Sequence, residues 1–535
     1  MAGDGTAARF GLHAGPVAWD AMFDHVIVGA GSAGCVVASR LSADPDRAVL
    51  LLEAGGARRP KEVAIPAAFS KLFHGDLDWD YRTVPQTELG GRQLYWPRGR
   101  GLGGSSSINA MMWVRGNPAD YDDWGVDGWS YADVVPFFKR AEDAVRRDPR
   151  HVGVGGPIRI EEQRDPNPGT HLFVAACQRA GIPRNVNANA GDNRGVDYTQ
   201  VFQRRGRRVS SADAYLDPVR KRRNLTIETD ATVTRLVLDD GRVTGVSYLV
   251  GDELRTARVR GDVVLAAGAI NTPQILMLSG IGDGEHLRSV GIEPVVDLPG
   301  VGRNLSDHLA CGLIMATTRT DTLVTAETPV QLLKYLLARK GLLTSNIGEA
   351  HAFLQSRSDL PGPDIELIFA PVPFLDHGDT EADRHGYTVG VILLQPRSRG
   401  TIRLASRDPF GPPLIDPRYL SDDHDLETLI WGLRRAQEVF DTEPLASVVT
   451  EPIRPDAIPQ DDTEREAVVR RWSETLYHPV GTAAIGKVVD ERLRVRGVDR
   501  LRVADVSVMP SLNRGHTHAP AVMIGERAAD LILRS

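Results

Sequence analysis

The chain has 535 residues, a length at which two domains or one large intergrown unit are expected rather than a single core. Its 42% hydrophobic and 25% charged residues are typical of a soluble globular protein and leave little room for large disordered regions. The net charge of -7 provides no overall basic field, so we expect no nucleic-acid partner.

The cysteine content and the lengths of the apolar runs narrow the class of protein further. Cys35, Cys177 and Cys311 are too few for a disulfide framework, and no CxxC pair suggests a zinc site. No apolar run reaches the roughly 18 residues of a membrane span. Residues 1–22 lack the pattern of a secretory signal and are interpreted as an N-terminal extension. We therefore expect a cytoplasmic protein, with peripheral attachment to a membrane as the alternative.

The first clear elements form a βαβ unit. A short apolar strand at residues 26–28 is followed by GAGSAG and a helix, and a second apolar strand follows at residues 48–52. Gly29, Gly31 and Gly34 have the G-x-G-x-x-G spacing that lets a helix N-terminus approach a pyrophosphate. Glu53 ends the second strand, where a carboxylate accepts hydrogen bonds from ribose hydroxyls and disfavours NADP. This pattern predicts a dinucleotide site without separating FAD from NAD.

The composition and the pattern of apolar residues change in the segments that follow. Residues 98–107 are rich in glycine and serine, and residues 208–250 alternate as strands with a DDG hairpin turn. Residues 263–282 repeat the order of strand, glycine and helix. Residues 312–473 combine strands with an amphipathic helix at 425–440, which indicates a separate α+β unit.

Four long segments carry a family resemblance. Residues 96–124 (WPRGRGLGGSSSINAMMWVRGNPADYDDW) and 268–282 (GAINTPQILMLSGIG) resemble the two signatures of the glucose–methanol–choline (GMC) oxidoreductases. LYHPVGTAAIG at 476–486 resembles the segment that holds their active-site histidine. The C-terminal segment, which contains GHTHAP at 515–520, is also similar. These motifs stand in the family's order from about residue 23 to the end.

The resemblance implies an FAD enzyme with an α/β, Rossmann-like (doubly wound) FAD-binding domain and an α+β substrate domain built on an antiparallel sheet. On this basis the FAD-binding domain comprises residues 23–160, 201–312 and 474–535. The substrate domain comprises an excursion at 161–200 and the main segment 313–473.

The resemblance and the glycine motif together give a set of cofactor-binding residues. They are Gly29, Gly31, Ser32, Ala33, Gly34, Glu53, Ala54, Arg98, Gly101, Gly104, Ser105, Asn109, Ala110, Met111, Met112, Val233, Ala267, Gly268, Asp505 and His518. Some members attach FAD covalently through a histidine in the serine-rich loop. Ile108 stands at that place and has no nucleophile, so we expect non-covalent FAD.

Two histidines match the family's catalytic positions. Alcohol oxidation through a flavin needs a base for the hydroxyl proton and a polar partner for the same oxygen. The resemblance implies His478 as the principal base and His516 as its partner, although the roles could be exchanged. From the sequence alone, His478 could equally be a turn histidine held by Pro479.

His518 departs from the usual asparagine of this motif. Alternation along an extended loop predicts that His516 and His518 face opposite sides, with His518 toward the cofactor or the interior. A metal site made of His478, His516 and His518 is the alternative, and we expect none because these side chains would not converge. The basic run at residues 204–224 is interpreted as a solvated surface rather than a partner site.

The predicted reaction converts an alcohol to an aldehyde or ketone, with primary alcohols favoured and choline or aryl alcohols as alternatives. The expected partners are a small-molecule alcohol and an electron acceptor: a quinone, a dye-like acceptor or oxygen. A quinone-linked dehydrogenase is favoured over an oxidase. A non-redox lyase or decarboxylase is a weaker alternative, because a few GMC members have such activities. The decarboxylases of the family resemble this chain around PRSRG at 396–400 but carry a cysteine just before it, and no cysteine stands there in this chain. A flavin-binding protein without catalysis is disfavoured by His478 and His516.

Overall fold

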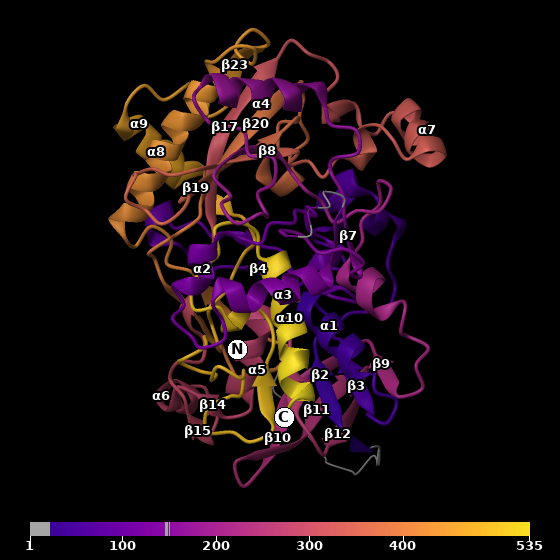
Figure 1. The fold of residues 1–535 in the computed structure, drawn as a ribbon. Helices are drawn as coiled ribbons and strands as arrows, with labels where there is room; N and C mark the ends of the chain where they lie inside the picture. Colours follow the sequence, from indigo (N-terminus) through magenta and orange to yellow (C-terminus); the bar gives the residue numbers. More distant parts are fainter. Residues whose placement is uncertain (1–21, 145–147, 149) are drawn as a thin grey trace, which may run out of the picture.

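A five-stranded parallel sheet lies at the centre of the part that carries the glycine turn (Figure 1). The computed structural model describes residues 22–144, 148 and 150–535. In spatial order, the strands are β25 (Leu501–Val503), β13 (Val263–Leu265), β2 (His25–Val28), β3 (Val49–Leu52) and β9 (Leu225–Glu228). The three central strands, β13, β2 and β3, are buried along their whole length, which explains their unbroken apolar runs.

Helices and a second sheet cover this parallel sheet. Helix α1 (Ser32–Leu41) packs on β2 and β3 and is itself covered by α10 (His518–Leu533). The second sheet has the order β1 (Met22–Phe23), β12 (Glu253–Val259), β11 (Arg242–Val250) and β10 (Ala231–Asp239). Its strands contact β2, β3 and β13. The arrangement is the expected layered α/β domain.

The predicted hairpin is present. Strands β10 and β11 pair antiparallel with Asp239 opposite Arg242. Asp240 and Gly241 form the connection, and both have positive φ, 45° and 73°. Two consecutive positive φ values are typical of the tight turns that match the twist of hairpin strands, which explains the DDG sequence.

A seven-stranded antiparallel sheet forms the upper part of the molecule in Figure 1. Its strands are β23 (Val449–Arg454), β17 (Leu309–Thr317), β20 (Gly386–Leu393), β19 (Ile365–Ala370), β18 (Ala350–Leu354) and β8 (Gly195–Tyr198), with β24 (Glu474–Thr475) paired to β17. Helices α8 (Asp423–Phe440) and α4 (Pro168–Arg179) pack on this sheet, and α9 (Asp462–Trp472) packs on α8.

The alternation of side chains along β20 separates the covered face from the open one. Val391 faces α8, which approaches so closely at Gly432 that a Cβ there would lie 2.4 Å from Val391 Cγ1. Gly390 and Ile392, one residue to either side, line a large cavity. Because side chains alternate along a strand, one face of this sheet packs on helices and the other forms a cavity wall.

The chain crosses between the two parts several times. Strand β8 pairs with β18 in the antiparallel sheet, and helix α4 packs on the same sheet. Strand β17 begins at Leu309, so residues 309–312 belong to the antiparallel sheet and not to the cofactor part. Strand β24 likewise moves the next boundary beyond residue 475. Residues 1–21 of the predicted extension lie outside the described residues, and Met22 already forms part of β1.

The remaining helices and strands lie in the connections. They are β4 (Tyr81–Arg82), β5 (Tyr95–Trp96), α2 (Pro118–Asp122), α3 (Tyr131–Ala141), β6 (Glu142–Ala144), β7 (Ile158–Ile160), α5 (Gly268–Leu278), β14 (Ile281–Gly282), α6 (Gly284–Ser289), β15 (Val296–Asp297), β16 (Arg303–Leu305), α7 (Pro329–Ala338), β21 (Gly400–Arg403) and β22 (Leu414–Asp416). Within the described part of the chain, no helix has the length and apolarity needed to span a bilayer.

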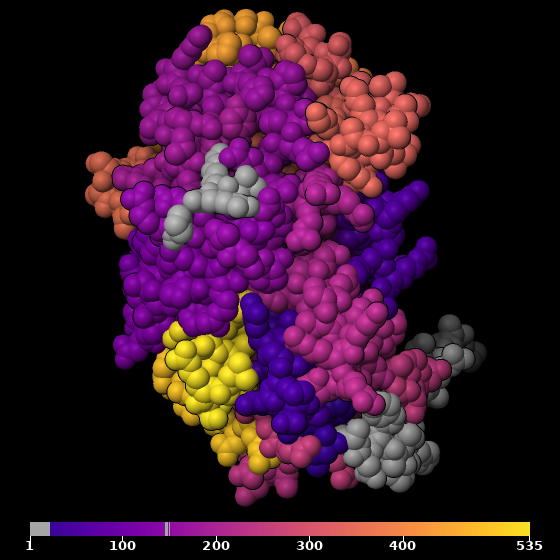
Figure 2. Space-filling model, turned by 45° about the vertical axis from the view of Figure 1, so that its right-hand side comes forward, coloured from indigo at the N-terminus to yellow at the C-terminus, as the bar shows by residue number. Residues whose placement is uncertain are grey.

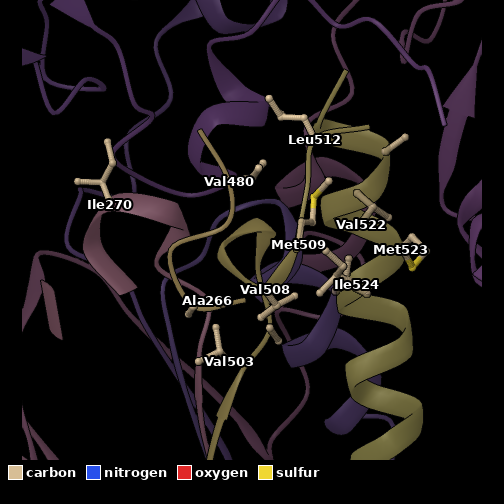
Figure 3. Packing of buried hydrophobic residues seen from close by; sticks show 14 of the residues in the cluster. Ala266, Ile270, Val480, Val503, Val508, Met509, Leu512, Val522, Met523 and Ile524 are labelled. Atoms are coloured by element: carbon tan, nitrogen blue, oxygen red, sulfur yellow. The ribbon is translucent and has the colours of Figure 1, made fainter. Parts of the chain in front are cut away.

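The C-terminal segment that carries GHTHAP is fixed by a buried apolar cluster (Figure 3). Val503 of β25 and Val508 and Met509 of the following turn pack with Val522 and Ile524 of α10. All five side chains are buried. The loop between β25 and α10 is therefore held at both ends by core packing, which positions its polar residues.

Candidate active site

The glycine turn after β2 brings three backbone segments close together. Gly29 has φ +100°, and a Cβ there would lie 2.6 Å from the carbonyl oxygen of Ala266. At Gly34 a Cβ would lie 1.9 Å from the carbonyl oxygen of Gly29, so helix α1 could not pack against the turn with any other residue. Gly31 is the N-cap of α1, and no side chain caps its first N–H groups. These free N–H groups and the helix dipole form an anion site.

Glu53 lies directly after β3 and ties the turn together. Its carboxylate accepts hydrogen bonds from the N–H groups of Ala30 (2.8 Å), Gly55 (2.9 Å) and Gly101 (2.9 Å). Burial raises the pKa of this carboxyl group. Glu53 also lines the cavity, so the side chain expected to bind ribose additionally holds the glycine-rich segment in place.

The segment from Arg98 to Met112 crosses over the glycine turn. At Gly104 a Cβ would lie 2.7 Å from Cα of Gly31, which shows how closely the two glycine-rich loops approach. Asn109 accepts a hydrogen bond from the guanidinium of Arg208 (2.9 Å), a buried residue, so the expectation of a solvated surface for residues 204–224 is wrong at this position. Arg98 donates to the carbonyl oxygen of Tyr477 (2.6 Å) and so connects this segment to the predicted catalytic loop.

These segments enclose one large cavity with a volume of about 1190 Å³. This volume exceeds that of most small-ligand pockets and suits a dinucleotide together with a substrate. The predicted residues that line it are Gly29, Gly31, Ser32, Ala33, Glu53, Ala54, Arg98, Gly104, Ser105, Asn109, Ala110, Met111, Met112, Val233, Ala267, Gly268, His478, Asp505, His516 and His518. Gly34 and Gly101 lie behind this lining. The uncapped start of α1, the open glycines and the cavity volume all fit FAD.

His478 is held at the cavity wall by a chain of hydrogen bonds. Its backbone N–H donates to Asp307 Oδ1 (2.7 Å), and its ring Nδ1 lies 2.9 Å from Nδ1 of His308. Nε2 of His308 lies 3.1 Å from the carbonyl oxygen of Leu394. Burial, together with the neighbouring His516, lowers the pKa of His308 to about 3. Burial, His516 and His308 likewise hold the pKa of His478 well below its ordinary value.

His516 contacts a buried carboxylate instead. Its Nε2 lies 3.1 Å from Oε1 of Glu366, a completely buried residue in the middle of β19. Nδ1 of His351, on the neighbouring strand β18, lies 3.4 Å from the same oxygen. Although burial acts in the opposite direction, His516 and His351 lower the pKa of Glu366 to about 2. The ring centroids of His478 and His516 are 5.0 Å apart, with the rings nearly perpendicular.

His518 points to a different part of the cavity. Its Nδ1 lies 3.1 Å from the hydroxyl of Ser32 at the start of α1, and its ring packs against Trp113 and Phe202. The expected extended loop is absent, because Thr517 is helical and His518 is the first residue of α10. The two side chains still diverge, because the His516 ring contacts Glu366 of β19 whereas the His518 ring contacts Ser32 of α1. His478, His516 and His518 therefore do not form a common metal-ligand cluster.

Three polar residues of this site were missed in the sequence. Asp307 and His308 lie side by side just before β17, and Glu366 interrupts the apolar run IELIFA. A charged residue within a buried strand is rare unless it is paired, so Glu366 was a detectable signal. His308 carried no such signal, because only the folded chain brings it next to His478.

The fold and the site define a dinucleotide-dependent oxidoreductase. Family models described as GMC oxidoreductase match residues 23–310 and 396–525. An uncharacterized GMC-type oxidoreductase of Mycobacterium tuberculosis is 49% identical, covering 96% of this chain and 99% of the relative. An alcohol dehydrogenase [acceptor] of Pseudomonas putida is 41% identical, with 96% of each chain covered. Mitochondrial choline dehydrogenase of Homo sapiens is 39% identical, covering 95% of this chain and 89% of the relative.

Solved structures agree with this assignment. Pyridoxine 4-oxidase from Mesorbium loti superposes with a TM-score of 0.89 at 32% identity, covering 96% of this chain and 99% of that chain. The chain belongs to the GMC oxidoreductase family, and it is an FAD-dependent oxidoreductase. The family, the fold class and the cofactor predicted from the sequence are thereby confirmed.

Proposed function

We propose that the protein oxidises uncharged, apolar primary alcohols to aldehydes, with His478 as the base and His516 as the partner that holds the substrate oxygen. The observation that carries this proposal is the hydrogen-bond chain from Leu394 through His308 to His478. When bound in this cavity, FAD would supply the oxidising group for the hydride of the carbinol carbon. The remaining steps are assigned to side chains of this protein.

The hydrogen-bond chain supports a specific tautomer for each ring. The carbonyl of Leu394 can only accept, so Nε2 of His308 carries a proton. Because burial keeps His308 neutral, its Nδ1 has a lone pair and accepts a hydrogen bond from the Nδ1–H of His478. The lone pair of His478 then lies on Nε2, in a side chain that lines the cavity. A neutral imidazole with this tautomer can accept the hydroxyl proton.

The surroundings of His516 support a different role. Since Glu366 is ionised, it can only accept, and Nε2 of His516 is the donor. The ring is held in place by this buried carboxylate, and we assign His516 the role of positioning the substrate oxygen and stabilising a developing alkoxide. The two histidines thereby have different roles at the same substrate oxygen: His478 accepts its proton, and His516 holds the oxygen.

The cavity wall formed by the antiparallel sheet favours an apolar substrate. Ala310, Gly312, Ile368, Gly390 and Ile392 supply only small or aliphatic surface. The carboxylates in the described lining are Glu53, Asp80, Asp376, Glu474 and Asp505. Each is already engaged by backbone N–H groups or by a basic side chain. None of these carboxylates is therefore unpaired and available as a counter-ion for a quaternary ammonium group such as that of choline.

The proposed electron acceptor is a quinone or another organic acceptor. The name of the Pseudomonas putida relative, alcohol dehydrogenase [acceptor], supports this choice. The test is anaerobic mixing of the holoenzyme with octan-1-ol, benzyl alcohol and choline, followed by dye reduction and peroxide measurement in air. Bleaching of the flavin band by octan-1-ol, with dye reduction and little peroxide, is expected. Bleaching by choline alone would contradict the proposed substrate, and stoichiometric peroxide would contradict the proposed acceptor.

A further inference from the structure

Helix α7 (Pro329–Ala338) exposes an unusual amount of aliphatic surface. It stands out from the antiparallel-sheet part at the upper right of Figure 1, and its segment is the coral region at the upper right of Figure 2. The large apolar side chains exposed here are Val324, Val330, Leu332, Leu333, Leu336 and Leu337. Leu337 is 79% exposed, more than any other large apolar side chain in the described chain. Clustering of this kind marks an interaction surface.

The geometry of the helix separates one anchoring residue from an exposed face. Tyr335 is buried, and its hydroxyl donates to the carbonyl oxygen of Ala64 (3.2 Å). Val330, Leu333 and Leu337 have i, i+3, i+7 spacing and lie on the side opposite Tyr335. Lys334 is the only charged residue within the helix and lies beside this face.

Cations surround the end of the helix. Arg339 and Lys340 follow it directly, and Arg164 donates to the carbonyl oxygen of Arg339 (2.5 Å). Gly206 lies against the same carbonyl group, which places the exposed Arg205 and Arg207 beside the helix. The basic run interpreted as a solvated surface therefore begins next to α7. These cations are concentrated here although the whole chain has a net charge of -7.

Acidic side chains also lie near the helix, and the contacts of these carboxylates are with other groups than the side chains of Lys334 and Lys340. Glu327 pairs with Lys71, and Asp165 accepts a hydrogen bond from the N–H of Gly341 (2.8 Å). An aliphatic helix face flanked by cations matches the interior and the headgroups of an anionic bilayer. A second copy fits less well, because a two-fold contact would bring the same cations together.

We propose that α7 and its flanking cations dock the protein on the surface of an anionic lipid membrane. The helix lies in the plane of the interface, Val330, Leu333 and Leu337 enter the acyl region, and Lys334, Arg339 and Lys340 contact phosphate groups. The helix is connected to the cavity wall, since buried Tyr335 belongs to a hydrophobic cluster that includes Ile347, a residue of the cavity lining. An apolar substrate or quinone could thus enter from the bilayer; this consequence alone rests on the proposed function.

The test is flotation of the holoenzyme with vesicles, without any alcohol, so that the result is independent of catalysis. One set of vesicles is phosphatidylcholine and the other is phosphatidylcholine with phosphatidylglycerol. We expect binding to the anionic vesicles that weakens with added salt. Leu333→Ser with Leu337→Ser should weaken binding about tenfold or more, and Lys334→Glu with Lys340→Glu should abolish the preference for anionic lipid.

The matched control is Leu254→Ser with Val295→Ser, which removes two exposed aliphatic side chains elsewhere on the surface. Flavin content and dye-linked turnover should stay unchanged in all three double variants, which shows that they fold. Failure of the unmodified protein to float, or equal binding by the Leu333/Leu337 variant, would overturn the proposal. Light scattering completes the test: a dimer that Leu333→Ser with Leu337→Ser dissociates, without vesicle binding, would identify a contact between copies instead.

Discussion

Nδ1 of His308 lies 2.9 Å from Nδ1 of His478, and Nε2 of the same His308 lies 3.1 Å from the carbonyl oxygen of Leu394. This relationship determines which nitrogen of His478 carries the lone pair. It also separates the proposed base from His516, which contacts an ionised carboxylate instead.

Replacement of His308 tests its role as a positioning residue. His308→Ala removes the acceptor for Nδ1–H of His478, so the tautomer with a basic Nε2 loses its support. We expect kcat for alcohol oxidation to fall about 10- to 100-fold, the size of a lost buried hydrogen bond, with FAD retained. His308→Gln keeps a side-chain acceptor and should recover part of the rate. Equal loss in both variants would instead indicate a packing role, as would unchanged kcat with lower FAD content.

Replacement of Glu366 tests the proposed partner role of His516. In Glu366→Gln the carboxylate charge is lost while the size is preserved, and the charge-assisted hydrogen bond that holds the His516 ring is weakened. Single-turnover flavin reduction should slow by about 10- to 100-fold. Glu349→Gln is the control, because Glu349 is also buried but bonds Asn167 and Thr170. A similar slowing in both variants would argue against a specific role for Glu366.

The pH dependence of the reaction follows from the burial of His478. Burial, His516 and His308 lower its pKa well below 6.5, so the neutral base persists into mildly acidic solution. We expect kcat/KM for the alcohol to stay near its maximum as the pH falls to about 6.5, with the acid limb at lower pH. An acid limb centred at or above neutral pH, measured with a slow substrate, would contradict this environment for the base.

The stability of the protein in acid should depend on His518. Burial and Arg208 lower the pKa of His518 in the folded state to about 3, whereas the unfolded chain titrates near 6.5. Between these values the unfolded state binds the proton, so the free energy of unfolding falls as the pH is lowered through this window, by up to about 1.4 kcal/mol per pH unit. In His518→Asn this contribution disappears. Urea unfolding at pH 7 and pH 5 should therefore show a smaller acid-induced loss in the variant; an equal loss would exclude His518 as a source.

The mode of FAD attachment can be tested directly. Ile108 is buried, lines the cavity and has no nucleophilic atom, so the cofactor should be held without a covalent bond. Acid precipitation of the holoenzyme should release all flavin absorbance into the supernatant. Yellow colour that remains in the washed pellet would show a covalent link between FAD and a side chain other than that of Ile108.

Local sequence patterns predicted those parts of the molecule whose conformation depends on residues that are adjacent in the sequence. The turn at Gly29 and the hairpin at Asp240 are set by backbone geometry that few sequences satisfy, so their positions could be predicted closely. The boundary before β17 could not, because the strand begins at Leu309 by pairing with residues far along the chain. The change in sequence pattern on which the predicted boundary was based occurs only a few residues after Leu309.

The residues of the site also differ in whether a local motif predicted them or only long-range contacts bring them together. The motif around His478 predicted a residue of the cavity wall, whereas His308 and Glu366 reach His478 and His516 only through long-range contacts. The direction of His518 was predicted from an extended loop, but Thr517 has helical backbone angles and His518 begins α10. Spacing alone therefore indicated two separate roles for the histidines without the correct local conformation.

The measurement that tests the central claim most directly is anaerobic single-turnover reduction of the flavin by octan-1-ol in the unmodified protein and in His478→Ala. If His478 is the base, flavin bleaching in the variant should be at least about 100-fold slower while FAD content and folding stay unchanged. Bleaching at the unmodified rate in a fully loaded His478→Ala variant would contradict the account.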